Sequence, residues 1–265
     1  MNNNSDNYYG DNRISTALLL AAGIGSRLFP LTKSSPKCLT LINEKSILER
    51  LVTNLKKQGF KRLVIVTGYK NECIMDFLGS ISGDLKIEYI YSALYRTTNN
   101  IYSLWMARNI INEPFVLLES DLVLNTSLLD EMVFPDKMAV AKMHPWLDGT
   151  TVSLNKQNQV TKFHKGTTDT YTGIRYKTVN IYSFSLPSWR AIVKKLNQYI
   201  AVGNVNCYYE AVFSEMIDNK TLSFKSVSFD HKPWYEIDTI NDLAEAEKLF
   251  PVELKTRVKR ERLYA

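Results

Sequence analysis

Residues 18–37 read Leu18-Leu-Leu-Ala-Ala-Gly-Ile-Gly-Ser-Arg-Leu-Phe-Pro-Leu-Thr-Lys-Ser-Ser-Pro-Lys37, an apolar run that breaks into a glycine loop. Gly23 and Gly25 lack a Cβ atom, so the backbone there can adopt otherwise strained dihedrals and direct several N–H groups at one anion. Arg27 adds a planar guanidinium fork and Lys37 adds a point charge. These residues predict a buried strand followed by a cradle for a triphosphate.

The spacing of this loop distinguishes it from two commoner phosphate-binding loops. A dinucleotide-binding loop has the pattern G-x-G-x-x-G, but the third glycine position here holds Leu28. A Walker loop has the pattern G-x-x-x-x-G-K-[ST], which the segment also lacks. An NAD-dependent oxidoreductase is therefore disfavoured. The two glycines by themselves would equally suit an ordinary strand-to-helix turn.

Residues 20–37 as a whole match the pattern L-A-A-G-x-G-x-R-L-x-P-L-T-x-x-x-P-K. The segment resembles the signature loop of nucleoside triphosphate transferases of the sugar-phosphate and cytidylyltransferase kind. The resemblance implies an α/β fold with a Rossmann-like, mostly parallel mixed sheet and flanking helices, of the nucleotidyltransferase or glycosyltransferase-A-like type. It also implies catalytic roles, with Arg27 on the departing pyrophosphate and Lys37 on the α-phosphate. The expected nucleotide contacts of the loop are Leu20, Ala21, Ala22, Gly23, Gly25 and Ser26.

Strands and helices alternate through the first half of the chain. Short apolar runs predict strands over 17–22, 63–67, 87–91 and 115–118. Helical periodicity predicts helices over 46–58, 71–78 and 101–111. This alternation is typical of a parallel, doubly wound sheet.

The regular alternation of strands and helices ends in the second half, where several strands follow one another. Its expected strands are 139–143, 151–154, 160–163, 178–184 and 222–227, with a hairpin turn at 155–159, and its expected helices are 186–199, 208–218 and 239–250. We expect one domain over 17–252, with a nucleotide-binding half at 17–135 and an acceptor-binding half at 136–252. Residues 1–16 are predicted to be a disordered N-terminal segment, and 253–265 a basic C-terminal tail.

Composition narrows the class of protein. The chain has 265 residues, 45% of them hydrophobic, which is ample for a buried core. Residues 1–16 do not read as a signal peptide and no run reaches the length of a bilayer span, so we expect a soluble, cytoplasmic protein. The formal net charge is +6, but five basic residues against Glu261 place +4 of it in 255–265, which argues against a nucleic-acid partner. Three scattered cysteines indicate neither a disulfide framework nor a zinc site.

Two carboxylates follow predicted strands. Asp121 ends the run Phe115-Val-Leu-Leu-Glu-Ser-Asp121, and Asp238 ends Trp234-Tyr-Glu-Ile-Asp238. Ligands of open α/β sheets bind beyond the carboxyl ends of strands, although either Asp could instead cap a turn or helix. The resembled family holds a catalytic Mg²⁺ with such a pair. The resemblance therefore implies that Asp121 and Asp238 hold Mg²⁺ as the cofactor.

The segment Leu94-Tyr-Arg-Thr-Thr-Asn-Asn-Ile-Tyr-Ser-Leu104 carries side chains that can read a base or a sugar. Helix capping by Thr98 or Asn99 is the structural alternative. The segment resembles the Asn-Asn-x-Tyr-Ser-Leu of bacterial phosphocholine cytidylyltransferases and of related enzymes that activate 2-aminoethylphosphonate. The resemblance implies CTP as the nucleotide, bound by Thr98, Asn99, Asn100 and Ser103.

Candidates for the acceptor site lie in the second half. Lys162 and Lys165 both lie near the position where the wider family places a lysine against the acceptor phosphate, and Lys165 is the preferred candidate. A solvated lysine in a hairpin is the structural alternative. Asp148 and Glu210 stand in segments rich in aromatic residues, and a carboxylate with an aromatic wall suits a small cation. The acceptor-binding residues expected are Asp148, Lys165, Tyr182, Glu210 and Trp234, although aromatic-rich strands are also typical of a core.

The expected activity is transfer of CMP from CTP to a small phosphonate or phosphate, with release of pyrophosphate. Leu147-Asp-Gly-Thr150 departs from the Asn-Glu-Trp of phosphocholine enzymes and, with Lys232-Pro-Trp-Tyr-Glu-Ile-Asp, looks more like phosphonate cytidylyltransferases. This favours 2-aminoethylphosphonate as the acceptor. The alternative acceptors are phosphocholine and a sugar 1-phosphate. The alternative to an enzyme is a non-catalytic homologue. The oligomeric state is left open, with a homodimer as one option.

Overall fold

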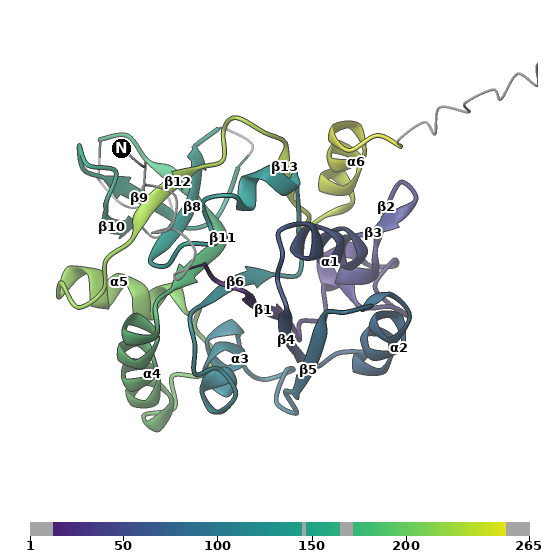
Figure 1. Cartoon of the computed structure of the whole chain (residues 1–265), viewed down its shortest axis with the longest axis horizontal. Helices are drawn as coiled ribbons and strands as arrows, with labels where there is room; N and C mark the ends of the chain where they lie inside the picture. Colours follow the sequence, from purple (N-terminus) through teal and green to yellow (C-terminus); the bar gives the residue numbers. More distant parts are fainter. Residues whose placement is uncertain (1–12, 145–146, 165–171, 253–265) are drawn as a thin grey trace, which may run out of the picture.

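The computed structural model describes residues 13–144, 147–164 and 172–252, which form one nine-stranded sheet covered by helices on both faces (Figure 1). The main strand order is β10-β9-β11-β6-β1-β4-β5, and β8 pairs with both β11 and β12. The sequence prediction of a mixed sheet with flanking helices is confirmed. None of the helices in these residues is long and apolar enough to cross a membrane.

The first half of the chain builds the parallel part of the sheet. Its strands are β1 (Thr16–Ala21), β4 (Arg62–Thr67), β5 (Lys86–Tyr91) and β6 (Phe115–Glu119). The helices α1 (Ile47–Lys57), α2 (Asn71–Ile81) and α3 (Asn100–Met106) connect them. All six residues of β1 are buried, because β4 and β6 flank this strand and helices cover both faces of the sheet.

The second half adds antiparallel strands to the edge at β6. These strands are β8 (Lys137–Lys142), β9 (Thr151–Leu154), β10 (Val160–His164) and β11 (Tyr176–Phe184), while β12 (Lys225–Ser228) runs parallel to β8. The helices are α4 (Leu186–Ala201), α5 (Glu210–Asp218) and α6 (Ile240–Leu249). β11 pairs antiparallel with β6, so the parallel part of the sheet ends at β6 and the antiparallel part begins at β11.

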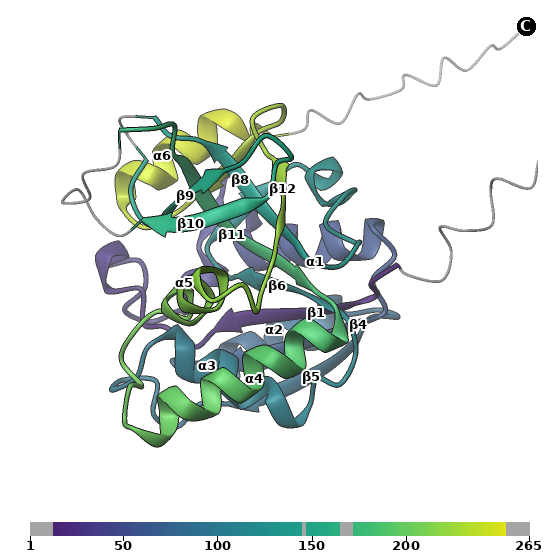
Figure 2. The ribbon, with the colours of Figure 1, turned by 90° about the vertical axis from the view of Figure 1, so that its left-hand side faces the viewer.

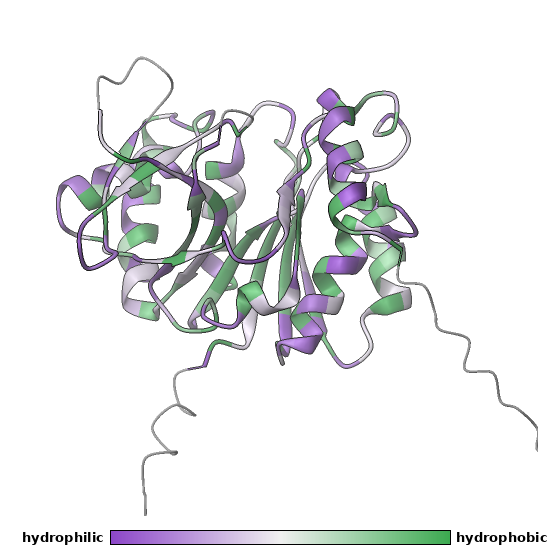
Figure 3. Ribbon diagram, turned by 90° about the horizontal axis from the view of Figure 1, so that it is seen from above, coloured by the Kyte–Doolittle hydropathy of each residue, from purple (hydrophilic) through white to green (hydrophobic). Residues whose placement is uncertain are grey.

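Two hydrophobic cores lie on opposite faces of the sheet. Residues of α1 and α2 pack with Leu19 of β1 on one face, together with Ala246 of α6. Residues of α3, α4 and α5 pack with Leu18 and Leu20 on the other, as Figure 2 shows for the helices. Figure 3 shows the apolar strands lying between the helices. The alternation of side chains along a strand sends Leu18 and Leu19 to different cores.

Several boundaries differ from the sequence predictions. The helix predicted to reach residue 111 ends as α3 at Met106 and continues as a 3-10 turn over Ala107–Asn109. The predicted disordered segment 1–16 overlaps the fold, since Ile14 is buried and Thr16 begins β1. The rest of that segment, 1–12, and the tail 253–265 lie outside the described residues, so those two predictions stay open.

Two short antiparallel pairings lie outside the large sheet. β2 (Leu41–Ile42) pairs with β3 (Lys45–Ser46), and β7 (Leu122–Leu124) pairs antiparallel with β13 (Trp234–Glu236). The sequence predicts a strand before Asp238 but not β7, which is only three residues long. Asp121 precedes β7 and Asp238 follows β13. The antiparallel pairing of these two strands therefore places both residues at the same end of the pair.

Candidate active site

The glycine loop after β1 packs against Lys37. Gly25 has a φ of +66°, and a Cβ added to it would lie 2.9 Å from Lys37 Cβ. The Thr32 hydroxyl donates to the Gly25 carbonyl at 2.8 Å, which fixes the loop in this conformation. Gly25 is therefore required both by its left-handed backbone and by the close approach of Lys37. Gly23 has open space at the corresponding position.

Lys37 joins the two predicted metal ligands directly. Its Nζ lies 2.8 Å from Asp121 Oδ2 and 2.6 Å from Asp238 Oδ1, and the Arg27 guanidinium lies 2.7 Å from the same Asp238 oxygen. The structure thus brings the two cations and the two carboxylates predicted from the sequence into one cluster. In this arrangement the two cations neutralise the two carboxylates.

The pKa of Lys37 follows from this enclosure. Burial by itself would lower the pKa of the ammonium group, but the charges of Asp121 and Asp238 outweigh that effect and raise the pKa above its ordinary value. Lys37 is therefore positively charged throughout the physiological pH range.

The backbone around Asp238 shows that this residue does not cap the last helix. Thr239 is the N-cap of α6, and its side chain and that of Asp242 form a reciprocal capping box. The Asp238 N–H donates to Asp242 Oδ2 at 3.1 Å, and the Ile237 N–H donates to the Asp121 carbonyl at 3.0 Å. The capping alternative for Asp238 is wrong, and its carboxylate faces the cluster instead.

The two carboxylates fit a magnesium ion that a nucleotide brings with it. Asp121 Oδ1 is buried and has no hydrogen-bond partner among the described residues. In the described ranges no group of three or more His, Cys, Asp and Glu side chains is arranged to hold a metal. Mg²⁺ is commonly bound by one or two carboxylates with phosphate oxygens and water. Asp121 and Asp238 would thus supply the protein part of such a site.

A cavity of about 430 Å³ lies between the glycine loop and the start of α3. Nine of the ten nucleotide-binding residues predicted from the sequence line it. Ala21 does not, because this last residue of β1 packs into the core. The lining residues are Leu20, Ala22, Gly23, Gly25, Ser26, Arg27, Lys37, Tyr95, Thr98, Asn99, Asn100, Ser103, Glu119, Ser120, Asp121, Tyr208 and Asp238.

The polar segment before α3 caps the helix and also lines the cavity. Asn99 is the N-cap of α3, where its side chain accepts a hydrogen bond from the Asn100 N–H. The Thr98 hydroxyl donates to the Leu94 carbonyl at 2.9 Å. Both residues also line the cavity, so capping and ligand contact are compatible.

A second cavity, of about 650 Å³, adjoins the first at Arg27, Asp121 and Asp238. Its described lining has eight acidic side chains and the basic residues Arg27, Lys177 and Lys232. The acidic residues are Glu119, Asp121, Asp148, Glu210, Asp230, Glu236, Asp238 and Asp242. A cavity with this imbalance favours a ligand that carries a positive charge.

The predicted acceptor-binding residues divide into three groups. Asp148, Glu210 and Trp234 line the second cavity. Tyr182 lines neither cavity: it is fully buried in an aromatic core, with its ring 5.7 Å from that of Tyr209. It faces this core because the antiparallel pairing of β11 with β6 packs it beneath α5. Lys165 lies outside the described residues.

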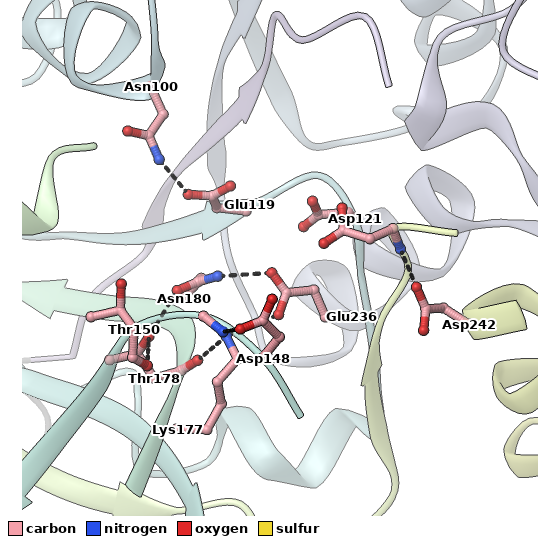
Figure 4. Close-up of polar contacts among 12 residues, drawn as sticks. Asn100, Glu119, Asp121, Asp148, Thr150, Lys177, Thr178, Asn180, Glu236 and Asp242 are labelled. Carbon is pink, nitrogen blue, oxygen red and sulfur yellow. Dashed lines mark hydrogen bonds and ion pairs between the residues drawn. The ribbon is translucent and has the colours of Figure 1, made fainter. Parts of the chain in front are cut away.

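A buried lysine that the sequence analysis did not consider stands in the wall of the second cavity. Lys177 has an exposed fraction of 2%, and its Nζ lies 3.0 Å from Glu236 Oε2. Asn180 donates to the other oxygen of Glu236 at 3.1 Å, as Figure 4 shows. The available signal in the sequence was a lysine directly before the predicted strand 178–184.

Glu119 was also missed, although it stands two residues before Asp121. It lines both cavities and accepts hydrogen bonds from Asn100 Nδ2 at 3.0 Å and from the Tyr209 hydroxyl at 2.8 Å (Figure 4 shows Asn100 and Glu119). Burial, with the charges of Asp121 and Glu210, raises the pKa of Glu119 to about 8. A carboxyl group at the end of an apolar strand was the signal.

Comparison with known proteins gives the following similarities. Residues 16–164 match the family model described as Nucleotidyl transferase. Over 88% of its length the chain is 27% identical to CMP-5'-(3-aminopropyl)phosphonate synthase of Streptomyces rubellomurinus, but it spans only 38% of that relative. It is 25% identical to 2-aminoethylphosphonate cytidylyltransferase of Lancefieldella rimae, over 86% of this chain and 90% of the relative.

A similar fold is found in the solved structure of CTP:phosphocholine cytidylyltransferase from Streptococcus pneumoniae. The TM-score is 0.76, and the match covers 89% of this chain and 98% of the other. At 19% sequence identity this likeness concerns the fold alone.

Proposed function

Because the chain belongs to the nucleotidyl transferase family, we propose that it transfers CMP from CTP to a small phosphonate or phosphate that carries an amino group. The best candidate for the acceptor is 2-aminoethylphosphonate, and the product would then be CMP-2-aminoethylphosphonate. Two relatives that are similar over most of this chain are named for aminoalkylphosphonates, which supports this choice.

The observation that carries the proposal is the junction of two unlike cavities. One is bounded by the glycine loop and the polar start of α3, and suits a nucleotide triphosphate. The other has eight acidic side chains and an aromatic wall that includes Trp234 and Tyr235, and suits an aminated acceptor. A sugar 1-phosphate is less suited to such a wall, because its hydroxyl groups carry no charge to match the carboxylates.

The reaction would be an in-line displacement. An acceptor oxygen forms a bond to the α-phosphorus of CTP, the bond between the α-phosphorus and the bridging oxygen breaks, and pyrophosphate leaves. Because the acceptor oxygen is already anionic near neutral pH, positioning and charge neutralisation are needed more than a general base.

The residues of the cluster have separate roles in this proposal. Arg27 and the amides of the glycine loop would hold the departing pyrophosphate. Lys37, which is kept positively charged, would neutralise charge at the α-phosphate; it lines the first cavity and contacts Asp121 and Asp238, which line both cavities. Asp121 and Asp238 would hold Mg²⁺, which when bound supplies further neutralisation of the phosphate oxygens.

Pyrophosphate release with CTP and Mg²⁺ tests the proposal. The acceptor panel is 2-aminoethylphosphonate, phosphocholine, phosphoethanolamine and glucose 1-phosphate, with Asp121→Asn as the inactive control. We expect turnover with the aminated acceptors, greatest with 2-aminoethylphosphonate. Turnover with glucose 1-phosphate alone would overturn the acceptor class. Absence of turnover with any acceptor and any nucleotide triphosphate would indicate a non-catalytic homologue.

A further inference from the structure

The acidic side chains of the second cavity differ in whether the chain already neutralises them. Asp121 and Asp238 are paired with Lys37 and Arg27. Glu236 is paired with the buried Lys177 on one oxygen and hydrogen-bonded by Asn180 on the other. These three carboxylates have partners from the chain itself.

Three further carboxylates are either held by the backbone or open to water. Asp242 is engaged in the capping box of α6. Asp230 accepts the Lys142 N–H on one oxygen and the Ser228 hydroxyl on the other. Asp148 is exposed and accepts the Gly149 N–H at 2.7 Å. Exposed charges are screened by solvent, so these groups exert a weaker pull on a ligand than a buried charge does.

Glu119 is different because its partners are neutral. The Asn100 amide and the Tyr209 hydroxyl both donate to Oε1, and none of the ion pairs among the described residues involves Glu119. Glu210, which is buried and lines the same cavity, is a second carboxyl group among the neighbours of Glu119. A buried carboxyl group carries its charge at low cost only where a cation lies beside it.

The position of Glu119 near Asp121 is compatible with a short ligand. It is two residues from Asp121, so their Cα atoms lie at most about 7 Å apart. Glu119 lines both cavities, which places it next to the point where nucleotide and acceptor would meet. A cation held there would be separated from a phosphonate at the Asp121 end by a short spacer of a few carbons.

We propose that Glu119 is the specificity-determining residue that receives the ammonium group of the acceptor and selects it over an uncharged group of equal size. This inference rests on the proposed function, since it assigns one part of the same site. Glu119 also orients Asn100 in the nucleotide cavity, so a test must separate its charge from its hydrogen bonds.

Glu119→Gln is the discriminating variant, because glutamine keeps an oxygen that can accept from Asn100 and Tyr209 but has no charge. The measurement is kcat/KM for 2-aminoethylphosphonate and for 2-hydroxyethylphosphonate, which has nearly the same shape and no positive charge. We expect the wild-type preference for the amine to fall by about 10- to 100-fold in the variant, while KM for CTP changes little. The matched control Glu131→Gln, on an exposed residue that lines neither cavity, leaves the preference unchanged.

The outcomes separate this inference from the function on which it rests. Turnover of the amine with an unchanged preference in Glu119→Gln would overturn the role of Glu119 but not the activity. No turnover by the wild type with any aminated acceptor would overturn the proposed function itself. If the variant does not fold, a structure of the wild-type chain with 2-aminoethylphosphonate decides: the nitrogen is expected within hydrogen-bond distance of Glu119, and its placement against Asp148 or Asp230 would contradict the inference.

Discussion

Lys37 lies between Asp121 and Asp238 and neutralises two side chains that would otherwise repel each other. In the proposed reaction the same ammonium group neutralises charge on the nucleotide. Lys37 would therefore exchange one set of anions for another when CTP binds. Two predictions follow at the scale of this residue.

Lys37→Met should lower turnover much more than it weakens nucleotide binding. The ammonium group would act on charge that develops at the α-phosphorus, and removal of one such group typically lowers kcat by about 100- to 1,000-fold. Steady-state kinetics of pyrophosphate release and CTP titration by calorimetry measure the two effects. Turnover equal to that of the wild type, with equal CTP affinity, would contradict the assignment.

The same variant should respond more strongly to Mg²⁺ in the absence of nucleotide. Without Lys37 the two carboxylates lose the cation that now occupies both of them, so a divalent ion has less to displace. Because a ligand that binds the folded chain stabilises it, we expect saturating Mg²⁺ to raise the Tm of Lys37→Met more than that of the wild type. Equal shifts would show that Lys37 and the metal do not compete.

Gly25→Ala should strain the loop, whereas Gly23→Ala should not. Alanine at Gly25 would have a φ of +66° and a Cβ 2.9 Å from Lys37 Cβ, and a left-handed alanine costs about 1–2 kcal/mol. The free energy of unfolding in urea is the measurement. Gly23→Ala, with open space around it, is the control for stability. A loss of equal size in both variants would refute the explanation.

At the scale of elements, the start of α6 holds one half of the cluster. Thr239 caps the helix, Asp242 completes the capping box, and Asp238 precedes the cap with its N–H bonded to the Asp242 carboxylate. Asp121, the other carboxylate of the cluster, is positioned by the pairing of β7 with β13 and by the hydrogen bond that the Ile237 N–H donates to the Asp121 carbonyl. The position of Asp238 therefore depends on the stability of α6 as well as on its own strand.

Thr239→Ala should lower the free energy of unfolding by about 1 kcal/mol, the usual cost of a lost N-cap. It should also raise KM for CTP, because Asp238 is held less firmly. Ser185→Ala is the matched control: Ser185 caps α4 in the same way but lies outside both cavities. It should lower stability to a similar degree and leave KM unchanged. An equal effect of both variants on KM would contradict the link between the cap and the site.

At the scale of the whole molecule, an ionic network ties the parallel strands together at the end opposite to the site. Arg62 of β4 lies 3.0 Å from Glu88 of β5 and 2.6 Å from Glu113, which in turn accepts the hydroxyl of Thr16 in β1 at 2.7 Å. Hydrogen bonds from Arg62 and Lys86 lower the pKa of Glu88 to about 2. The network therefore crosses the strands on which the glycine loop is built.

This network predicts how stability depends on pH. The pKa of Glu88 is lower in the folded chain, about 2, than its ordinary value of 4.5. Its contribution is therefore fully present above pH 4.5 and is lost as the pH falls toward 2. We expect Glu88→Gln to be less stable than the wild type at pH 7, and the difference in urea unfolding to shrink between pH 4.5 and pH 3. A difference independent of pH would show that the ion pairs of Glu88 contribute nothing.

The first half of the fold was largely predictable, because its signals are local. The burial of 17–22 and the period of 46–58 depend on neighbours within a few residues, and both appear in the structure as β1 and α1. The three-residue strand β7 was not predictable, because so short a run has no periodicity of its own and forms only when β13 is beside it. The assignment of Tyr182 to the acceptor site was wrong, because the composition of an aromatic segment does not distinguish a core strand from a cavity wall.

By itself, the sequence determined the strand, the glycine loop and the four charged residues of the cluster, because residue types and short spacings predict a phosphate-binding loop and mark the strand ends. Only the tertiary structure decided how those charges are partnered. Lys37 meets Asp121 across 84 residues of chain and Asp238 across 201, Lys177 neutralises Glu236, and Glu119 has neutral partners. The physical reason is that the energy of a charged group depends on the charges and solvent around it. In this protein, segments far apart in the chain supply those surroundings when the antiparallel half folds against the parallel half.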